Sequence, residues 1–374
     1  MHNSSSGAGQ ASLRLAASIE GLTNRAAGWL LNSGIQEPSG GVARYYRSDT
    51  QEFRAVSTEI TGYAVSFLVY LHRSTGNAAC LEAAGRAGRY LTRVAWNPGL
   101  RTMPFECRGQ GELAYFFDLG IITRGLLSLW RATHEQEFLD TAAGCALCME
   151  TDFRGPSGHH PVLALPGKHP LEGDGGWSRH PGCYQAKAAM AWLEVAEAGA
   201  AGDRYRELYD QALDRHLATH ASFLDQGQGQ ERVMDRLHAY SYFLEALLPR
   251  AGVPRYAQAL RDGIGRVERL LREIRPVFER SDVYAQLLRI RLLAATAGAV
   301  PLDLERAGEE ATALAAFQLE DADPRVAGGF SFGRRAGVLT PFVNPVSTSF
   351  AVQALRMWAE HLSGRFHLEI RDLI

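Results

Sequence analysis

The chain has 374 residues, of which 46% are hydrophobic and 21% are charged, the balance of a globular protein with a large core. This composition excludes a disordered or fibrous chain, and the formal net charge of −2 provides no global basic field for nucleic acid or an anionic membrane surface. No apolar run reaches the roughly 18 residues of a membrane span, and the N-terminal residues lack the pattern of a secretory signal. We therefore expect a cytoplasmic protein without membrane insertion.

Apolar residues recur at helical spacing along almost the whole chain, and no stretch shows the sustained alternation of a strand. Six predicted helices are apolar on nearly every side, which is typical of buried helices. More charged helices with a single apolar face lie between them, and these are expected on the outside, at 78–95, 137–153 and 203–223. The apolar helices are predicted at 59–75, 117–133, 183–199, 235–249, 282–297 and 347–362.

The apolar helices recur at intervals of about one helical hairpin plus a loop of variable length. An amphipathic helix at 11–32 has no inner partner before it, and the last apolar helix has almost nothing after it, so these two can pair and close a ring. The sequence therefore predicts an all-α fold. We expect residues 1–374 to form a single domain, an (α/α)6 toroid of six helical hairpins.

Two features fall outside the helical pattern. Glycine pairs at 40–41 and 328–329, each followed by aromatic residues and arginine, predict short β-hairpins at one mouth of the ring. Segment 154–182 is rich in glycine, proline and histidine, and loops of this length in compact proteins are usually functional or disordered. Its Trp177 and its histidines favour an ordered lid.

The sequence contains no H-E-x-x-H motif and no P-loop, and the glycine-rich segment GGFSFGRR does not follow a strand-helix unit. The five cysteines are odd in number and thinly spread, so we expect reduced and mostly buried thiols. Neighbouring His159, His160, His180 and Cys183 do not fix a complete ligand set. We therefore expect no metal and no cofactor.

Polar residues cluster where the predicted inner helices begin. In an up-and-down ring these helix N-termini meet at one mouth, where their dipoles favour an anionic or polyhydroxylated ligand. Capping alone also places Asp, Ser and Thr at helix starts, and it explains Asp282 and Ser347 at least as well. Glu59 and Asp118 differ because they lie in otherwise apolar segments, where a buried carboxylate needs partners. The candidate catalytic residues are Glu59, Asp118, His180, Tyr184, Asp235 and Tyr242; the candidate substrate-binding residues are Trp177, Arg236, His238, Tyr240, Arg280, Arg334 and Asn344.

Four segments carry a resemblance to known proteins: TEITGYAVSFLVYLHRSTGN, AYFFDLGIITRGLLSLWRATHEQEFLDTA, GGFSFGRR and NPVSTSFAVQALRMW. On these residues, nearly the whole chain resembles the six-hairpin (α/α)6-toroid enzymes of carbohydrate metabolism. It looks most like D-glucuronyl C5-epimerase-like proteins, and more distantly like unsaturated-glucuronyl hydrolases and the helical domains of polysaccharide lyases. The resemblance implies polysaccharide-biosynthesis enzymes as partners. It also implies tyrosines and a glutamate near the uronate, for which Tyr184, Tyr240, Tyr242 and Glu59 are candidates.

The first hypothesis is C5 epimerisation of a uronic-acid unit in an oligo- or polysaccharide. A base must remove the C5 proton on one face while an acid returns a proton on the other. Tyr184 or His180 would oppose Tyr242 in these roles. A planar guanidinium suits the substrate carboxylate, and the candidates for holding it are Arg236, Arg280 and Arg334.

Two alternatives stay open at this point. A glycoside hydrolase would use Asp118 and Asp235 as paired carboxylates. A non-catalytic glycan-binding or scaffold protein would use the same mouth without chemistry. Arginines are also expected to border the mouth and to make it electropositive, which would favour uronates over neutral sugars; these are Arg44, Arg236, Arg280, Arg334 and Arg335.

Overall fold

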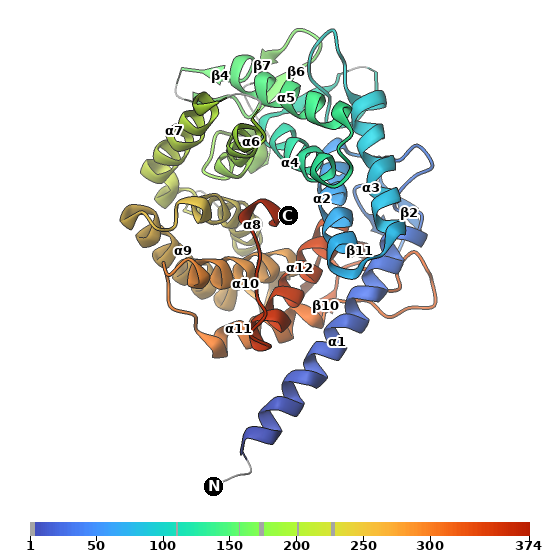
Figure 1. Ribbon diagram of the computed structural model, residues 1–374, viewed down its shortest axis with the longest axis vertical. Helices are drawn as coiled ribbons and strands as arrows, with labels where there is room; N and C mark the ends of the chain where they lie inside the picture. Colours follow the sequence, from blue (N-terminus) through green and yellow to red (C-terminus); the bar gives the residue numbers. More distant parts are fainter. Residues whose placement is uncertain (1–3, 110, 157, 172–175, 200–201, 226–228) are drawn as a thin grey trace.

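The computed structural model describes residues 4–109, 111–156, 158–171, 176–199, 202–225 and 229–374. Within these residues, six helices pack side by side in chain order, and the last packs against the first to close a ring (Figure 1). The inner helices are α2 (Thr58–Thr75), α4 (Phe116–Thr133), α6 (Gln185–Glu197), α8 (Gln230–Leu247), α10 (Ser281–Thr296) and α12 (Pro345–Leu362). The predicted (α/α)6 toroid is confirmed.

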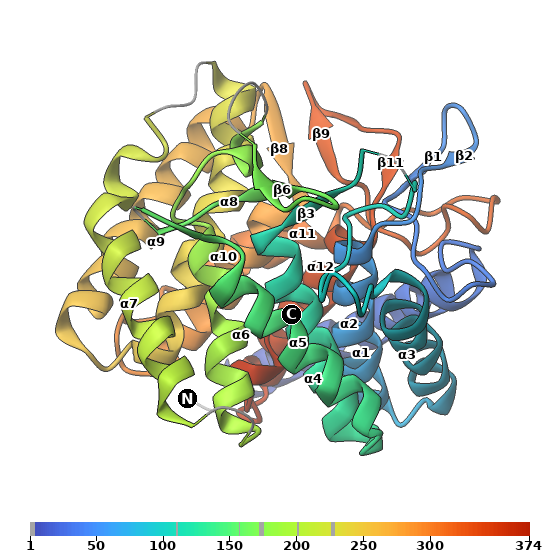
Figure 2. The same cartoon turned by 90° about the horizontal axis from the view of Figure 1, so that it is seen from above.

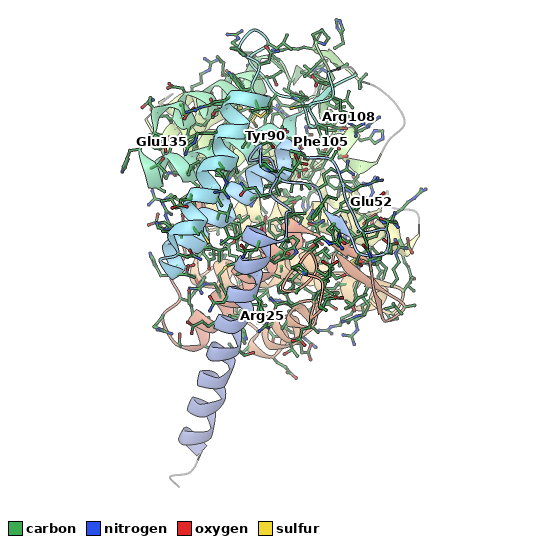
Figure 3. All side chains as sticks on the ribbon, turned by 90° about the vertical axis from the view of Figure 1, so that its right-hand side faces the viewer. Arg25, Glu52, Tyr90, Phe105, Arg108 and Glu135 are labelled. Carbon is green, nitrogen blue, oxygen red and sulfur yellow. The ribbon has the colours of Figure 1, made fainter. Side chains whose placement is uncertain are left out.

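A second layer of helices covers the outside of this ring, and the N-terminal part of α1 extends beyond it (Figures 1 and 3). The outer helices are α1 (Ser4–Asn32), α3 (Ala78–Tyr90), α5 (Gln136–Thr151), α7 (Asp203–Thr219), α9 (Pro254–Ile274) and α11 (Leu304–Ala315). Helix α1 packs on α12, as expected from the pairing of the two ends. A π-helical turn (Leu91–Ala95) continues α3, and short 3-10 turns follow at Trp177–Arg179, His220–Ser222, Leu248–Arg250 and Ile370–Asp372.

Glycines set the close packing between neighbouring inner helices. A Cβ added at Gly120 of α4 would lie 2.5 Å from the Cα of Ala188 in α6, and one at Gly125 would lie 2.5 Å from the carbonyl oxygen of Gly62 in α2. Neither contact distance is accessible to a real side chain, so these positions admit only glycine without a shift of the helices. The close approach explains how α2, α4 and α6 enclose a narrow interior.

Short antiparallel strands gather at one end of the helices (Figure 2). Several lead directly into inner helices: β3 (Leu113–Tyr115) precedes α4, β8 (Phe278–Arg280) precedes α10, and β11 (Phe342–Val343) lies just before α12. The inner-helix N-termini therefore meet at this strand-bearing mouth. The sheets have the orders β11-β1-β2, β10-β9-β8 and β3-β6-β7, with β4 pairing β5; the remaining strands are β1 (Tyr46–Arg47), β2 (Glu52–Phe53), β4 (Arg154–Gly155), β5 (Gly158–His159), β6 (Val162–Ala164), β7 (His169–Pro170), β9 (Gly333–Arg335) and β10 (Val338–Leu339).

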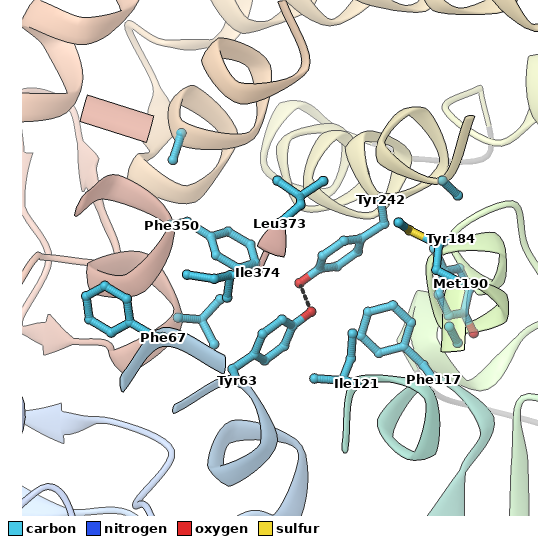
Figure 4. Packing of buried hydrophobic residues seen from close by; sticks show 14 of the residues in the cluster. Tyr63, Phe67, Phe117, Ile121, Tyr184, Met190, Tyr242, Phe350, Leu373 and Ile374 are labelled. Atoms are coloured by element: carbon cyan, nitrogen blue, oxygen red, sulfur yellow. Dashed lines mark hydrogen bonds between the residues drawn. The ribbon is translucent and has the colours of Figure 1, made fainter. Parts of the chain in front are cut away.

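The C-terminal residues enter the ring from the opposite end. Asp372 pairs at 2.6 Å with Arg73 in the last turn of α2, and Ile374 lies near the centre of the ring (Figures 1 and 4). The Ile374 carbonyl accepts hydrogen bonds from Lys187 at 3.3 Å and Arg289 at 3.2 Å. This tail fills the interior beneath the strand-bearing mouth.

None of the five cysteines forms a disulfide in the structure, and four of them are buried while Cys107 is exposed, as expected for mostly buried thiols. In the part of the chain that the structure describes, no helix is both long enough and apolar enough to cross a membrane.

Candidate active site

A half-enclosed cavity of about 390 Å³ opens at the strand-bearing mouth, within the size range of small-molecule sites. Residues from the starts of α2, α4 and α6, from α8 and from the strand before α10 converge on it. Most of the predicted candidates belong to this set. The lining residues are Arg44, Glu59, Phe105, Tyr115, Phe117, Asp118, Trp177, Ser178, Tyr184, His238, Tyr242 and Arg280.

Two carboxyl groups enter the cavity from neighbouring helices. Glu59 lies in the first turn of α2, which Ser57 caps, and Asp118 lies in the first turn of α4. Asp118 is only 7% exposed, and its Oδ2 atom has no hydrogen-bond partner. Burial raises the pKa of Glu59 to about 7, although the charge of Arg44 opposes the rise. Burial, followed by repulsion from Glu59, holds the pKa of Asp118 well above its usual range, so this pair retains a proton near neutrality.

His238 presents an unprotonated ring nitrogen. Its Nδ1 atom faces two acceptors, Gln286 Oε1 at 2.8 Å and Asp282 Oδ2 at 3.4 Å, so Nδ1 carries the proton of the neutral imidazole. Burial lowers the pKa of His238 to about 4, although Asp282 opposes this shift. The ring is therefore neutral at physiological pH and its Nε2 has an available lone pair.

Two tyrosine hydroxyls meet across the ring at the floor of this region (Figure 4). Tyr63 of α2 donates to Tyr242 of α8 at 2.8 Å, which leaves the hydroxyl proton of Tyr242 for a ligand. Burial, followed by the negative charge of Glu59, raises the pKa of Tyr242 well above its usual range. Sequence reasoning missed Tyr63 because it lies in an apolar run. Its only signal is a phenol placed one helical turn after Glu59.

The arginines at the cavity are all engaged by carboxylates, which corrects the expectation of an electropositive mouth. Arg280 pairs with Asp282 at 2.6 Å and Asp235 at 2.9 Å, and Arg44 pairs with Glu106 at 2.8 Å. Arg44 also lies over the ring of Phe105, in the loop that Figure 3 shows near the end of α3. Arg334 and Arg335 likewise pair with Glu279 and Glu231. Counting arginines in the sequence could not reveal these partners.

Segment 154–182 supplies one wall of the cavity through Trp177 and Ser178. The Tyr184 hydroxyl donates to the carbonyl oxygens of Ser178 and His180, each at 3.0 Å, and so ties this segment to the start of α6. The Trp177 ring packs edge-on against Tyr184, with centroids 4.9 Å apart. Residues 157 and 172–175 of the expected lid lie outside the described residues.

Several predicted candidates do not line the cavity. His180 is exposed, and its backbone carbonyl accepts the hydrogen bond from the Tyr184 hydroxyl. The Tyr240 hydroxyl bonds to Nδ1 of His220 at 2.8 Å, away from the site. Asn344 caps α12 by accepting from the backbone amides of Val346 and Ser347.

The remaining candidates act on other residues. Asp235 pairs with Arg280 at 2.9 Å without lining the cavity itself, and so helps to orient that guanidinium. Arg236 donates to the Phe223 carbonyl at 2.9 Å and lies over the ring of the same residue. Glu279 and Arg280 are neighbours in β8, so their side chains point to opposite sides of the strand. Arg280 faces the cavity, whereas Glu279 and its partner Arg334 line a separate open groove of about 810 Å³.

The cavity thus combines groups that can accept a proton with groups that can donate one. Glu59 and the Nε2 of His238 can accept near neutrality, while Tyr242 and protonated Asp118 can donate. Helices α2 and α8 stand opposite one another in the ring, so Glu59 faces the cavity from the side opposite His238 and Tyr242. Among the described residues, no group of three or more His, Cys, Asp or Glu side chains is placed to hold a metal ion.

The fold and the cavity define an (α/α)6 toroid with an acid-bearing site at one mouth. No protein-family model matches the chain, and no curated protein matches it by sequence. Solved structures do match. The cellobiose 2-epimerase of Spirochaeta thermophila is similar with a TM-score of 0.73 at 15% identity, over 97% of this chain and 100% of the epimerase.

Two further structures share the architecture. A sugar epimerase from a ruminal bacterium has a TM-score of 0.69 at 10% identity, over 91% of this chain and 98% of its own. A D-mannose isomerase has a TM-score of 0.67 at 10% identity, over 91% of this chain and 97% of the isomerase. At these identities the similarity establishes the fold.

Proposed function

We propose that the protein is a carbohydrate epimerase or isomerase that moves a proton at a carbon of a bound sugar. The observation that carries the proposal is the placement of Glu59 on one side of the cavity and His238 with Tyr242 on the other. Two-sided proton transfer needs this arrangement, because one group removes the proton and a second returns one to the opposite face. The shared fold with two epimerases and an isomerase supports the same class of reaction.

Each group has a role that its protonation state supports. Glu59, with a pKa of about 7, serves as the base, and Tyr242 returns the proton from the other side. Asp118 remains protonated and donates a hydrogen bond to the oxygen on which charge develops, as a preorganised donor in a partly closed site. The neutral His238 ring packs edge to face against Tyr242, with centroids 4.6 Å apart, and its Nε2 accepts a hydrogen bond from a substrate hydroxyl.

The specific reaction that we propose is C5 epimerisation of a uronic-acid unit. The carboxylate next to C5 lets the carbanion delocalise as an enolate, which Asp118 and the two lining arginines can stabilise. Arg280 stays a candidate for holding that carboxylate, and Arg44 replaces Arg236 and Arg334 in this role. Tyr242 retains its proposed role, while Tyr184 becomes a residue that holds the lid segment, because its hydroxyl proton is bonded to backbone carbonyls.

Glycoside hydrolysis is the second candidate, and the carboxyl pair favours it. Glycosidases use one protonated and one ionised carboxyl group, and Glu59 with Asp118 can supply both states at neutral pH. Asp235, the earlier partner of Asp118 in this hypothesis, pairs with Arg280 instead.

Deuterium exchange read by NMR separates these functions. The protein is incubated in D2O with a uronate-containing oligosaccharide, its carboxyl-reduced counterpart, cellobiose and mannose. Deuterium at C5 of the uronate without new chain ends supports the full proposal. Deuterium at C2 of a reducing sugar alone rejects the uronate assignment but retains the epimerase class, and new reducing ends support the hydrolase. Absence of both reactions leaves a glycan-binding protein.

Glu82→Gln, at an exposed position on α3, provides the matched control for Glu59→Gln.

A further inference from the structure

The two cavity carboxyl groups lack a cation of their own. Asp118 is more than nine-tenths buried, lines the cavity and has an Oδ2 atom without a hydrogen-bond partner. Among the described residues, no arginine, lysine or histidine nitrogen lies within 4 Å of the carboxyl oxygens of Asp118 or Glu59. A buried acid without a partner is costly to a folded protein and marks a site that a ligand completes.

The cations nearby are already engaged. Arg44 is held by Glu106, and the three nitrogens of Arg280 bond to Asp282 and Asp235. The two lysines of the chain lie elsewhere, with Lys187 paired to Glu245 and Lys168 paired to Asp152. Since His238 is neutral, the described residues that line the cavity offer these carboxyl groups no cation that is not already paired with another carboxylate.

We propose that Asp118 and Glu59 bind the ammonium group of an amino sugar. The inference rests on the proposed function in taking the ligand to be a sugar, and it specifies which kind: a hexosamine with a free amine. An ammonium group offers three donors, which suits two carboxylates converging from α2 and α4. An uncharged hydroxyl or N-acetyl group cannot provide the same charge compensation.

Binding of an ammonium group to these two carboxyl groups should release a proton. Near pH 7 the empty pair holds a proton because burial and mutual repulsion disfavour two charges. In a complex with an amino sugar, an ammonium placed between the groups favours both charged forms, so Asp118, which stays protonated in the proposed uronate complex, releases its proton to the buffer. Tyr115, Tyr184, Tyr242, His238, Arg44 and Arg280 also face this cavity. Burial raises the pKa of Tyr184 and of Tyr242 and lowers that of His238, so these three side chains stay neutral through the same pH range.

Calorimetry on a matched set of disaccharides tests the proposal. The β-1,4-linked disaccharide of glucosamine is compared with its N-acetylated form and with cellobiose, which has hydroxyls in place of the amines. We expect the amine to bind about 10- to 100-fold more tightly than cellobiose at pH 7 and low salt, the range of a charge-assisted hydrogen bond. We also expect proton release, measured as a dependence of the heat on the ionisation enthalpy of the buffer.

Two variants assign the preference to these residues. Asp118→Asn and Glu59→Gln should each remove most of the amine preference, while Glu82→Gln should retain it. Equal affinity for the three disaccharides would overturn the proposal, as would an amine preference that survives in both cavity variants. Binding of Ca2+ or Mg2+ alone that depends on Asp118, with no amine preference, would assign the acids to a metal instead. Deuterium exchange without amine preference would retain the proposed function and reject this inference. Amine preference without deuterium exchange would retain this inference and reject the proposed function.

Discussion

Tyr63 and Tyr242 join opposite sides of the ring, with their hydroxyl oxygens 2.8 Å apart (Figure 4). Tyr63 comes from α2 and Tyr242 from α8, and the bond between them lies beneath the carboxyl groups of the cavity. Since Tyr63 is the donor, Tyr242 is oriented with its own proton free. The relationship makes Tyr63 a positioning residue and Tyr242 the proposed acid.

Replacing each tyrosine by phenylalanine should separate these roles. We expect Tyr242→Phe to abolish deuterium exchange, because the proton donor is lost. Tyr63→Phe should lower kcat with little change in KM, because Tyr242 keeps its proton but loses its orientation. Each variant should lower the free energy of unfolding by about 0.5–1.5 kcal/mol, the usual net value of one hydrogen bond. Equal exchange rates in Tyr242→Phe and the native protein would exclude Tyr242 as the acid.

Asp118→Asn should abolish activity or ligand binding without loss of stability. The folded state raises the pKa of Asp118, so it binds a proton that the unfolded chain releases near pH 4. Stability contributed by the protonated form is therefore lost as pH rises from about 4 through neutrality. Asparagine removes this dependence, so the free energy of unfolding at pH 8 should be unchanged within about 1 kcal/mol or should increase.

Asp282→Asn provides the contrasting control for Asp118→Asn. Burial would raise the pKa of Asp282, but pairing with Arg280 outweighs it and the pKa is lowered. Removing one partner of a buried ion pair typically costs about 3–5 kcal/mol. Chemical denaturation of both variants at pH 5 and pH 8 measures the difference. Strong destabilisation by Asp118→Asn at pH 8 would assign Asp118 a structural role.

The pH profile of exchange should report on Glu59. If Glu59 is the base, kcat/KM rises as pH increases through about 7, where the carboxyl group loses its proton. Arg44 lowers the pKa of Glu59, so Arg44→Gln should move the inflection to higher pH. Glu59→Gln should abolish exchange over the whole pH range. An inflection unchanged in both variants would show that another group titrates.

Glu245 should matter to stability far more than to chemistry. It bonds to Arg289 at 2.6 Å and Lys187 at 2.9 Å, and all three side chains are fully buried below the cavity. Glu245→Gln leaves two buried cations short of a partner and should cost about 3–5 kcal/mol of unfolding free energy. Glu273→Gln, in the exposed pair with Arg269, should change it by no more than about 0.5 kcal/mol. Similar melting temperatures for both variants would contradict this account.

Helix periodicity predicts the fold well because it reports burial directly. The predicted inner helix at 117–133 matches α4 (Phe116–Thr133), and the one at 282–297 matches α10 (Ser281–Thr296). Long helices that are apolar on all sides have few alternatives to an inner layer. The ends of helices are less predictable: the helix predicted to reach residue 223 ends at Thr219, and a 3-10 turn at His220–Ser222 follows it.

The candidate site was predictable only to the level of the mouth. Helix starts indicate which end of the ring a residue occupies, and this placed Glu59 and Asp118 correctly at the cavity. The position of a residue at a helix start does not indicate where its side chain points. The contact of Tyr240 with His220 and the capping of α12 by Asn344 could therefore not be predicted. Pairing across long sequence separations, as between Arg44 and Glu106, depends on packing that local pattern does not encode.

The central claim is that the cavity moves a proton at a sugar carbon, and deuterium incorporation from D2O measures this most directly. We predict that a uronate-containing oligosaccharide gains deuterium at C5 with the native protein and with Glu82→Gln, without chain cleavage. Glu59→Gln and Tyr242→Phe should show no incorporation while retaining their fold by circular dichroism. Unchanged protium at every sugar carbon with the native protein, across the uronate, its reduced counterpart, cellobiose and mannose, would contradict the account.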